Sequence, residues 1–310
     1  MARKSFKNIK FIISLITVIA LGLWFFSDDV GLKESADNEI ISSKGDMVVT
    51  FMDVGQGDAA LVELPDGKNL LIDGGNPGDG ENIADYLSAK HISKLDYVVA
   101  THPHADHIGG MGYIIENMEV GSVFAPKIDP SDVPATKSYE NFLQSVKDKN
   151  LKITAAKSGN TLFEGEGYKA ECFSPKNDKN DGLNNYSVVF KLTHGSDSFL
   201  FTGDAEKEIE EEMIKNKLSL DSDVLKVGHH GSSSSSSKEF LNAVSPKFAV
   251  ISSGRDNSYG HPHGETLKAF DTLKGFEKLY RTDVDNTITA YSNGKGNIKF
   301  TTGGITVAGE

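Results

Sequence analysis

The sequence predicts a mixed α/β domain that opens with antiparallel strands. Short stretches rich in β-branched residues, separated by glycine-containing turns, come first and favour neighbouring strands joined by short loops. Strands then alternate with helical stretches, which is typical of α/β folds. Several apolar strands end in loops that carry histidine or aspartate, and such loops commonly present functional side chains.

The elements are expected in the following order. The first strands are expected at 47–52, 59–64 and 69–72, followed by a helix at 82–90, a strand at 97–100 and a helix at 108–117. Strand, helix and strand follow at 122–125, 139–149 and 152–156, and then strands around 169–173, 187–192, 198–202, 224–227 and 248–252. No internal repeat of fixed period is visible, so a repeat architecture is not expected.

Residues 1–29 have the pattern of an export signal. Basic residues without acidic ones occupy positions 1–10, and an uncharged apolar run follows at 11–26. The run is short for a membrane span, which suits a cleaved signal peptide, whereas the lack of a small-x-small cleavage site favours an uncleaved signal-anchor. The basic flank stays in the cytoplasm, so the rest of the chain is expected outside the cell, either anchored in the cell membrane or secreted. The polar residues 30–46 are expected to form a tether.

Charge and cysteine content restrict the classes of function. The formal net charge of −12 is a poor match for a protein that holds long nucleic acid by broad electrostatic attraction. It permits phosphate substrates, because bound divalent ions dominate the local field, and it favours a small or locally held substrate. The single Cys172 excludes an internal disulfide and a cysteine-based metal site, and is expected to be buried.

Residues 101–110, Thr-His-Pro-His-Ala-Asp-His-Ile-Gly-Gly, concentrate metal-binding side chains directly after an apolar strand. His102 and His104 lie two apart in an extended segment, so their rings point the same way and can bind one ion. Asp106 and His107 follow the turn and can reach a second ion. Imidazole and carboxylate ligands without thiolate suit Zn²⁺, Mn²⁺ or Fe.

Three further strands end in the same manner. Asp204 follows the strand expected at 198–202. Alone it would be read as a helix N-cap, but beside the histidine cluster it is expected to bridge two metals. His229 and His230 follow an apolar strand, and because adjacent side chains diverge only one of them is expected to bind metal. His261 and His263 flank a proline that keeps both rings on one side; the alternative is a structural turn.

Together these motifs resemble the metallo-β-lactamase superfamily. Residues 101–110 are similar to its His-x-His-x-Asp-His signature, and Asp204 is similar to its bridging aspartate. More narrowly, residues 47–293 resemble the exported hydrolase domain of the ComEC competence proteins and its stand-alone relatives. The segments that carry this closer resemblance are Asp53-Val-Gly-Gln-Gly-Asp-Ala59, Asn184-Asn-Tyr-Ser187, Val227-Gly-His-His-Gly-Ser232, Tyr259-Gly-His-Pro-His263 and Arg281-Thr-Asp283.

The resemblance implies an αββα sandwich over residues 47–310, with two divalent metal ions, Zn²⁺ or Mn²⁺, between the sheet edges at one end. The implied ligands are His102 and His104 for the first ion, Asp106, His107 and His229 for the second, and Asp204 as the bridge. One departure concerns the histidine that the superfamily usually has upstream of the bridging aspartate, where this chain has Asn184-Asn185. His194 is a weak substitute, so the first site lacks a strong donor, which favours exchangeable Mn²⁺ over permanent Zn²⁺.

The expected mechanism uses both ions to hold and deprotonate a bridging water, which attacks phosphorus or a carbonyl carbon. His261, His263 and the ligand-free histidine of the adjacent pair, His230, are the candidates that protonate or contact the leaving group. Asp106 is expected to act in catalysis as well as to bind metal.

Other residues are expected to support this site. Asp58 and Asp73 are expected to orient the ligand histidines through hydrogen bonds. The pair Gly109-Gly110 is expected to let the backbone pass close to the metals without Cβ clashes.

The leading functional hypothesis is an exported hydrolase of phosphodiester bonds, in DNA or another phosphate ester. A hydrolase of lactone, lactam or thioester bonds on the same metal pair is the alternative. A catalytically silent surface binding module is a third possibility, because the superfamily histidine is missing. The membrane is an expected partner through the N-terminal segment, and no protein partner is evident in the sequence.

Overall fold

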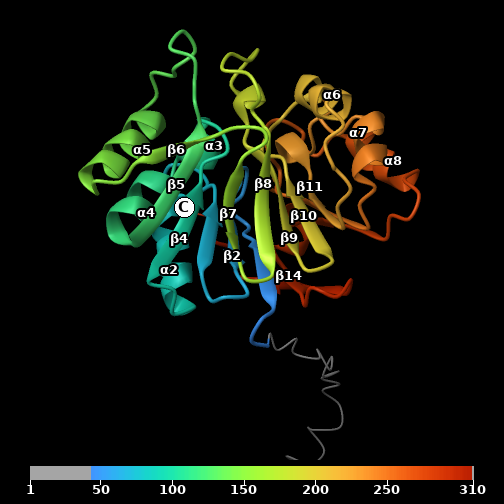
Figure 1. Cartoon of the computed structure of the whole chain (residues 1–310), viewed down its shortest axis with the longest axis horizontal. Helices are drawn as coiled ribbons and strands as arrows, with labels where there is room; N and C mark the ends of the chain where they lie inside the picture. The colour runs from blue at the N-terminus through green and yellow to red at the C-terminus, as the bar shows by residue number, and fades with distance from the viewer. Residues whose placement is uncertain (1–42, 309–310) are drawn as a thin grey trace, which may run out of the picture. The chain divides into compact units, whose positions relative to one another are not determined.

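The computed structural model describes residues 43–308 of the chain. Within this range two β-sheets pack face to face, with helices on both outer faces (Figure 1), so the αββα sandwich is present. The predicted signal or anchor at 1–29 and most of the predicted tether lie outside the described residues. Among the helices of residues 43–308, none is long and apolar enough to cross a membrane.

The first sheet has eight strands within the described residues, in the spatial order β15-β14-β1-β2-β3-β4-β5-β6. Its strands are β1 (Met47–Phe51), β2 (Ala60–Glu63), β3 (Asn69–Ile72), β4 (Lys94–Val99), β5 (Glu119–Pro126), β6 (Ile153–Ala156), β14 (Thr287–Ser292) and β15 (Ile298–Gly304). The strands from β15 to β3 pair antiparallel, as the opening of the sequence predicts, and β3 to β6 run parallel.

The second sheet has seven strands in the described part, in the order β13-β12-β11-β10-β9-β8-β7. Its strands are β7 (Thr161–Gly165), β8 (Tyr168–Ser174), β9 (Val189–His194), β10 (Asp197–Phe201), β11 (Val224–Lys226), β12 (Phe248–Ile251) and β13 (Lys278–Arg281). The strands β10 to β13 are parallel to one another, whereas β7 to β10 are antiparallel. The parallel halves matter for function because their carboxyl ends share one edge of each sheet.

Helices cover each sheet on its outer side. Those packed on the first sheet are α2 (Asp79–Ala89), α3 (Ala105–Ile108), α4 (Met111–Asn117) and α5 (Lys137–Asp148). Those packed on the second sheet are α6 (Lys207–Lys215), α7 (Lys238–Val244) and α8 (Gly264–Asp271). The short α9 (Thr282–Asp285) and the 3₁₀ turns η1 (Asn184–Tyr186) and η2 (Gly228–Gly231) complete the described elements.

A continuous apolar core fills the space between the two sheets. Phe51 of β1 contacts Phe201 of β10 across the layers, with ring centroids 6.1 Å apart. Tyr97 of β4 stacks on Phe163 of β7 at 4.2 Å. These aromatic contacts fix the sheets against each other beyond the simple burial of area, so the loops at the sheet edges start from a rigid base.

The predicted helix 108–117 is in fact two helices, α3 and α4, separated at Gly109-Gly110. A Cβ on Gly109 would lie 2.2 Å from the nitrogen of Pro77, and one on Gly110 would lie 2.3 Å from the carbonyl oxygen of Gly74. The glycine pair therefore lets the chain pass close to the loop after β3. That the pair also makes room for the metals stays a prediction.

Candidate metal centre

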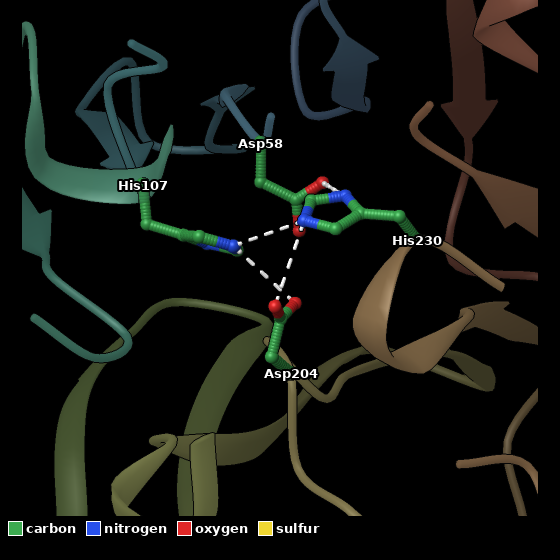
Figure 2. A group of neighbouring side chains, drawn as sticks. All are labelled: Asp58, His107, Asp204 and His230. Atoms are coloured by element: carbon green, nitrogen blue, oxygen red, sulfur yellow. Dashed lines mark hydrogen bonds and ion pairs between the residues drawn. The ribbon is translucent and has the colours of Figure 1, made fainter. Parts of the chain in front are cut away.

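Loops from both sheets meet at the edge where the parallel strands end. In the first sheet, the segment 101–107 follows β4, beside the end of β3. In the second sheet, Asp204 follows β10 and the histidine pair follows β11, its parallel neighbour. Figure 2 shows side chains from these separate segments pointing toward one another. The strand-end positions found in the sequence thus converge in space.

A first group of potential metal ligands consists of His102, His104 and Asp204. His102 Nε2 lies 3.0 Å from His104 Nδ1 and 3.8 Å from Asp204 Oδ2. The two rings meet edge to face, with centroids 4.8 Å apart. The spacing of two in an extended segment therefore brings both imidazoles to one point, as the sequence predicts.

A second group consists of Asp58, His107, Asp204 and His230, which Figure 2 shows together. His107 Nε2 lies 3.3 Å from Asp204 Oδ1 and 3.3 Å from His230 Nε2. His230 Nε2 lies 3.5 Å from Asp204 Oδ2. The donor atoms of the group all lie within 4.8 Å of one another, and Asp204 belongs to both groups, which is the arrangement expected of a bridging ligand.

Asp106 lies beside the second group. Its Oδ2 is 3.2 Å from His230 Nε2 and 3.9 Å from His107 Nε2. The carboxylate therefore faces the same ring nitrogens that approach Asp204. This position is compatible with the ligand role expected of it.

The donor set fits divalent cations. Asp204 Oδ1 and Asp58 Oδ1 are buried without a hydrogen-bond partner among the described residues. Nδ1 of His107 donates to Asp73 and Nδ1 of His230 donates to the Ser252 carbonyl. In the neutral rings both Nε2 atoms therefore carry lone pairs and face each other at 3.3 Å, and a cation between them would satisfy both. Nitrogen and oxygen donors without thiolate suit Zn²⁺ or Mn²⁺.

The electrostatic coupling within the cluster is strong. Burial lowers the pKa of His102 well below its usual value, and the neighbouring His107 adds to this effect. Burial alone would lower the pKa of His107 as well, but the carboxylates of Asp204 and Asp73 raise it well above its usual value. Burial would raise the pKa of Asp204, yet the imidazoles around it hold that pKa well below the usual range. Such perturbed groups gather at functional sites.

Asp73 holds His107 in place from behind. Asp73 Oδ2 accepts a hydrogen bond from His107 Nδ1 at 2.8 Å and from the Thr101 hydroxyl at 2.6 Å. The Thr101 backbone N–H donates to Asp73 Oδ1 at 2.8 Å. Because Nδ1 carries the proton shared with Asp73, Nε2 is the ring nitrogen left to face Asp204. This is the contact that the orienting role expected of Asp73 requires.

Of the adjacent histidines, the structure brings His230 into the metal group in place of His229. Both residues have positive φ angles, 48° for His229 and 52° for His230, so the chain turns sharply within η2. His230 is buried and its Nδ1 donates to the carbonyl of Ser252 at 3.0 Å. His229 Nδ1 instead contacts Ser234 Oγ at 2.9 Å and Glu206 Oε1 at 3.3 Å. His229 Nε2 nevertheless lies 3.8 Å from Asp204 Oδ2, and His229 lines the cleft beside the cluster. The candidate ligand group therefore contains His230, where the sequence analysis assigned His229.

An open cleft of about 260 Å³ leads to the cluster. His261 lines this cleft with a buried Nδ1 that lacks a hydrogen-bond partner within residues 43–308. Burial and the neighbouring His229 and His230 lower the pKa of His261 to about 4. His263 is outside the cleft lining; its Nδ1 accepts from the Ser233 N–H at 2.9 Å, which is a structural contact.

The remaining candidate, His194, is not part of the cluster. It ends β9, where its Nδ1 contacts Ser292 Oγ at 2.7 Å. Asn184, at the place of the usual superfamily histidine, instead directs its amide toward Glu206 Oε1 at 3.3 Å, and its own Oδ1 is buried without a hydrogen-bond partner in the described part.

The sequence analysis missed Lys226. Its Nζ pairs with Asp58 Oδ2 at 2.7 Å, and both side chains are buried, with 6% and 8% of their surface exposed. Asp58 Oδ1 in turn lies 3.6 Å from His230 Nδ1. A lysine within the apolar run Val224–Val227 was the available signal, since buried lysines nearly always have a partner.

Comparison with known proteins gives consistent results. Residues 52–255 match the family model described as the metallo-beta-lactamase superfamily. The chain is 32% identical to ComE operon protein 3 of Bacillus subtilis (strain 168), over 80% of this chain and 33% of the relative. It is also 32% identical to competence protein ComA of Neisseria gonorrhoeae, over 83% of this chain and 34% of the relative. The chain thus spans about a third of the length of these relatives.

Among solved structures, Igni18, a metallo hydrolase from the archaeon Ignicoccus hospitalis KIN4/I, has a similar fold. Its TM-score is 0.51 at 19% identity, and the match covers 78% of this chain and 98% of Igni18. At this identity the likeness concerns the fold alone.

Proposed function

Because this chain belongs to the metallo-β-lactamase superfamily, we propose that it is a metal-dependent hydrolase of phosphodiester bonds. The observation that carries the proposal is the pair of ligand groups that share Asp204. Two such sites side by side suit displacement at phosphorus, because both the attacking and the leaving oxygen need charge stabilisation. Similarity to competence proteins over about four fifths of the chain supports DNA or a related phosphate ester as the substrate.

The residues of the chain have distinct roles in this proposal. His102 and His104 would hold one ion, His107, His230 and Asp106 the other, and Asp204 both. When bound, the ions would supply an activated water and neutralise the charge that develops on the phosphate oxygens. His261 lines the cleft, so its imidazole is placed to contact the leaving oxygen.

Asp58 and Lys226 would act on His230 from the side away from the cleft. Lys226 fixes one oxygen of Asp58, and the other oxygen lies near His230 Nδ1. This arrangement keeps a carboxylate beside a ligand histidine without leaving its charge unpaired.

The proposal includes a location outside the cytoplasm. The support is the basic flank at 1–10 and the apolar run at 11–26, which together have the pattern of an export signal or anchor. Protease added to intact cells should digest the folded part of the chain if it is displayed on the surface. Protection from protease in intact cells, and absence from the medium, would argue against export.

The test uses the full chain, stripped of metal and resupplied with Mn²⁺ or Zn²⁺. Hydrolysis of bis(p-nitrophenyl) phosphate and of single- and double-stranded DNA is measured for the wild type and for Asp204→Asn. Asp178→Ala removes an exposed, surface-paired carboxylate and serves as the control. Metal-dependent hydrolysis that is lost only in Asp204→Asn supports the proposal.

Other outcomes select among the alternatives. Bound metal without phosphodiester cleavage, together with hydrolysis of a lactone, lactam or thioester, would contradict the proposal. The protein would then be a metal-dependent hydrolase of acyl compounds. Bound metal without turnover of any of these substrates would favour a silent binding module. Equal activity in Asp204→Asn and wild type would remove the basis of the proposed site.

A further inference from the structure

A second pocket of about 370 Å³ adjoins the metal cleft. Gln56 lines both cavities, so one side chain forms part of the wall of each. The second pocket is built from the loop after β1, the loop after β12 and the residues around α9. The two cavities therefore adjoin at Gln56.

The acidic side chains of this pocket are already occupied. Asp53 accepts hydrogen bonds from the Gly55 N–H at 3.2 Å and from the Thr306 hydroxyl at 2.8 Å. Asp283 receives two donors of Arg281, Nε at 3.0 Å and Nη2 at 2.5 Å. These carboxylates are held by donors of the chain itself.

The donors of the pocket, by contrast, are not all used. Arg255 donates its Nε to the carbonyl of Asp283 at 3.2 Å, and within residues 43–308 its terminal nitrogens have no acceptor and no carboxylate within 4 Å. Gln56 Oε1 accepts from the Gly254 N–H at 3.1 Å, which leaves the Gln56 amide N–H₂ free in the described part. The Asn286 side chain has no hydrogen bond to any described residue either. A guanidinium and two amide groups therefore remain to bind an acceptor.

Free donors around an arginine are the chemistry that recognises a phosphate group. From this we infer that the pocket binds the phosphate next to the scissile one, so that the substrate is a single-stranded oligonucleotide with at least two phosphates. The inference rests on the proposed phosphodiesterase function, and it names the substrate class of the same site.

Tyr259 supports a nucleotide over a simple polyphosphate. It lines the metal cleft and leaves 67% of its surface exposed, which is unusual for a large aromatic side chain. Its ring stacks on His261 with centroids 5.6 Å apart and planes inclined by 23°. A tyrosine held in this way offers one face to solvent, where the base of the nucleotide can stack.

The test compares TpT and TpTpT, which differ by one nucleotide and so by one phosphate and one thymidine, with the full chain in Mn²⁺. The quantity measured is the ratio of kcat/KM for TpTpT to that for TpT. In Arg255→Gln this ratio should fall about tenfold, because a charge-assisted phosphate contact is lost. The control Lys274→Gln removes an equal charge from an exposed side chain that has no hydrogen bond or ion pair with any described residue, and its ratio should equal that of the wild type.

Binding of the same compounds is measured with Ca²⁺ in place of Mn²⁺, as a function of salt. The salt slope of TpTpT binding should decrease by about 1 in Arg255→Gln. An unchanged ratio in Arg255→Gln, or an equal loss for both substrates, would overturn the second-phosphate pocket. If the wild type cleaves neither compound, the proposed function is wrong. The binding measurement then tests the pocket by itself: tighter binding of TpTpT than of TpT supports the pocket, and equal binding contradicts it.

Discussion

Replacement of Lys226 by methionine should destabilise the fold strongly. The Nζ to Oδ2 distance to Asp58 is 2.7 Å and both side chains are almost fully buried, so the substitution leaves a carboxylate without a partner in the interior. His230 Nδ1, at 3.6 Å from the other carboxylate oxygen, is beyond hydrogen-bond distance and does not replace the lysine. Breaking a buried pair on one side costs about 3–5 kcal/mol, a large share of a typical total of about 5–15 kcal/mol.

The assay is urea unfolding of the full chain in EDTA, so that no metal compensates the carboxylate. With a slope of about 2–3 kcal/mol/M, the midpoint should fall by about 1–2 M. Lys247→Met is the matched control, because Lys247 pairs with Asp223 at the same 2.7 Å but leaves 48% of its side chain exposed. The control should lose about 0–1 kcal/mol. Equal losses of unfolding free energy in the two variants would refute the reasoning. Burial of the ion pair, and not its N–O distance, would then not determine how much the pair contributes to stability.

Three further predictions follow from single contacts. Asp73→Asn should weaken metal binding about 10–100-fold, measured by competition with a chromogenic chelator, because His107 loses the acceptor that orients it; an unchanged affinity would show that this contact is dispensable. Burial raises the pKa of the Cys172 thiol to about 12, so the native chain at pH 8 should not react with a thiol reagent, whereas the urea-unfolded chain should react at one thiol; rapid native labelling would contradict this. Tyr259→Ala should weaken binding of a single-stranded oligonucleotide by about 1–3 kcal/mol in a polarisation assay, while Tyr113→Ala, also exposed, should not.

The layout of the site could be predicted from sequence because it depends on local patterns. Strand-end positions, extended spacing and turn residues place the 101–107 segment at the carboxyl end of β4 and Asp204 at that of β10. The two ends meet because the two sheets pack face to face. The antiparallel opening follows from the same local signals. Helix α5, expected at 139–149, spans Lys137–Asp148 for the same reason.

Features that depend on distant partners could not be predicted in this way. Strand β1 pairs with β14, so Met47 lies opposite Ser292, a residue near the other end of the chain. No local sequence pattern predicts this pairing. The selection between His229 and His230 depends on two left-handed backbone positions in η2, where periodicity gives no information. The break at Gly109 reflects contact with Pro77, which only the folded chain brings close.

The most direct test of the account is the metal content of the chain. Equilibrium dialysis against Mn²⁺ or Zn²⁺ followed by elemental analysis should give two ions per chain for the wild type, because two ligand groups share Asp204. His104→Ala should remove the first ion and leave the second, and Asp204→Asn should weaken both. A wild-type chain without bound metal, or an Asp204→Asn chain with the full complement, would contradict the account.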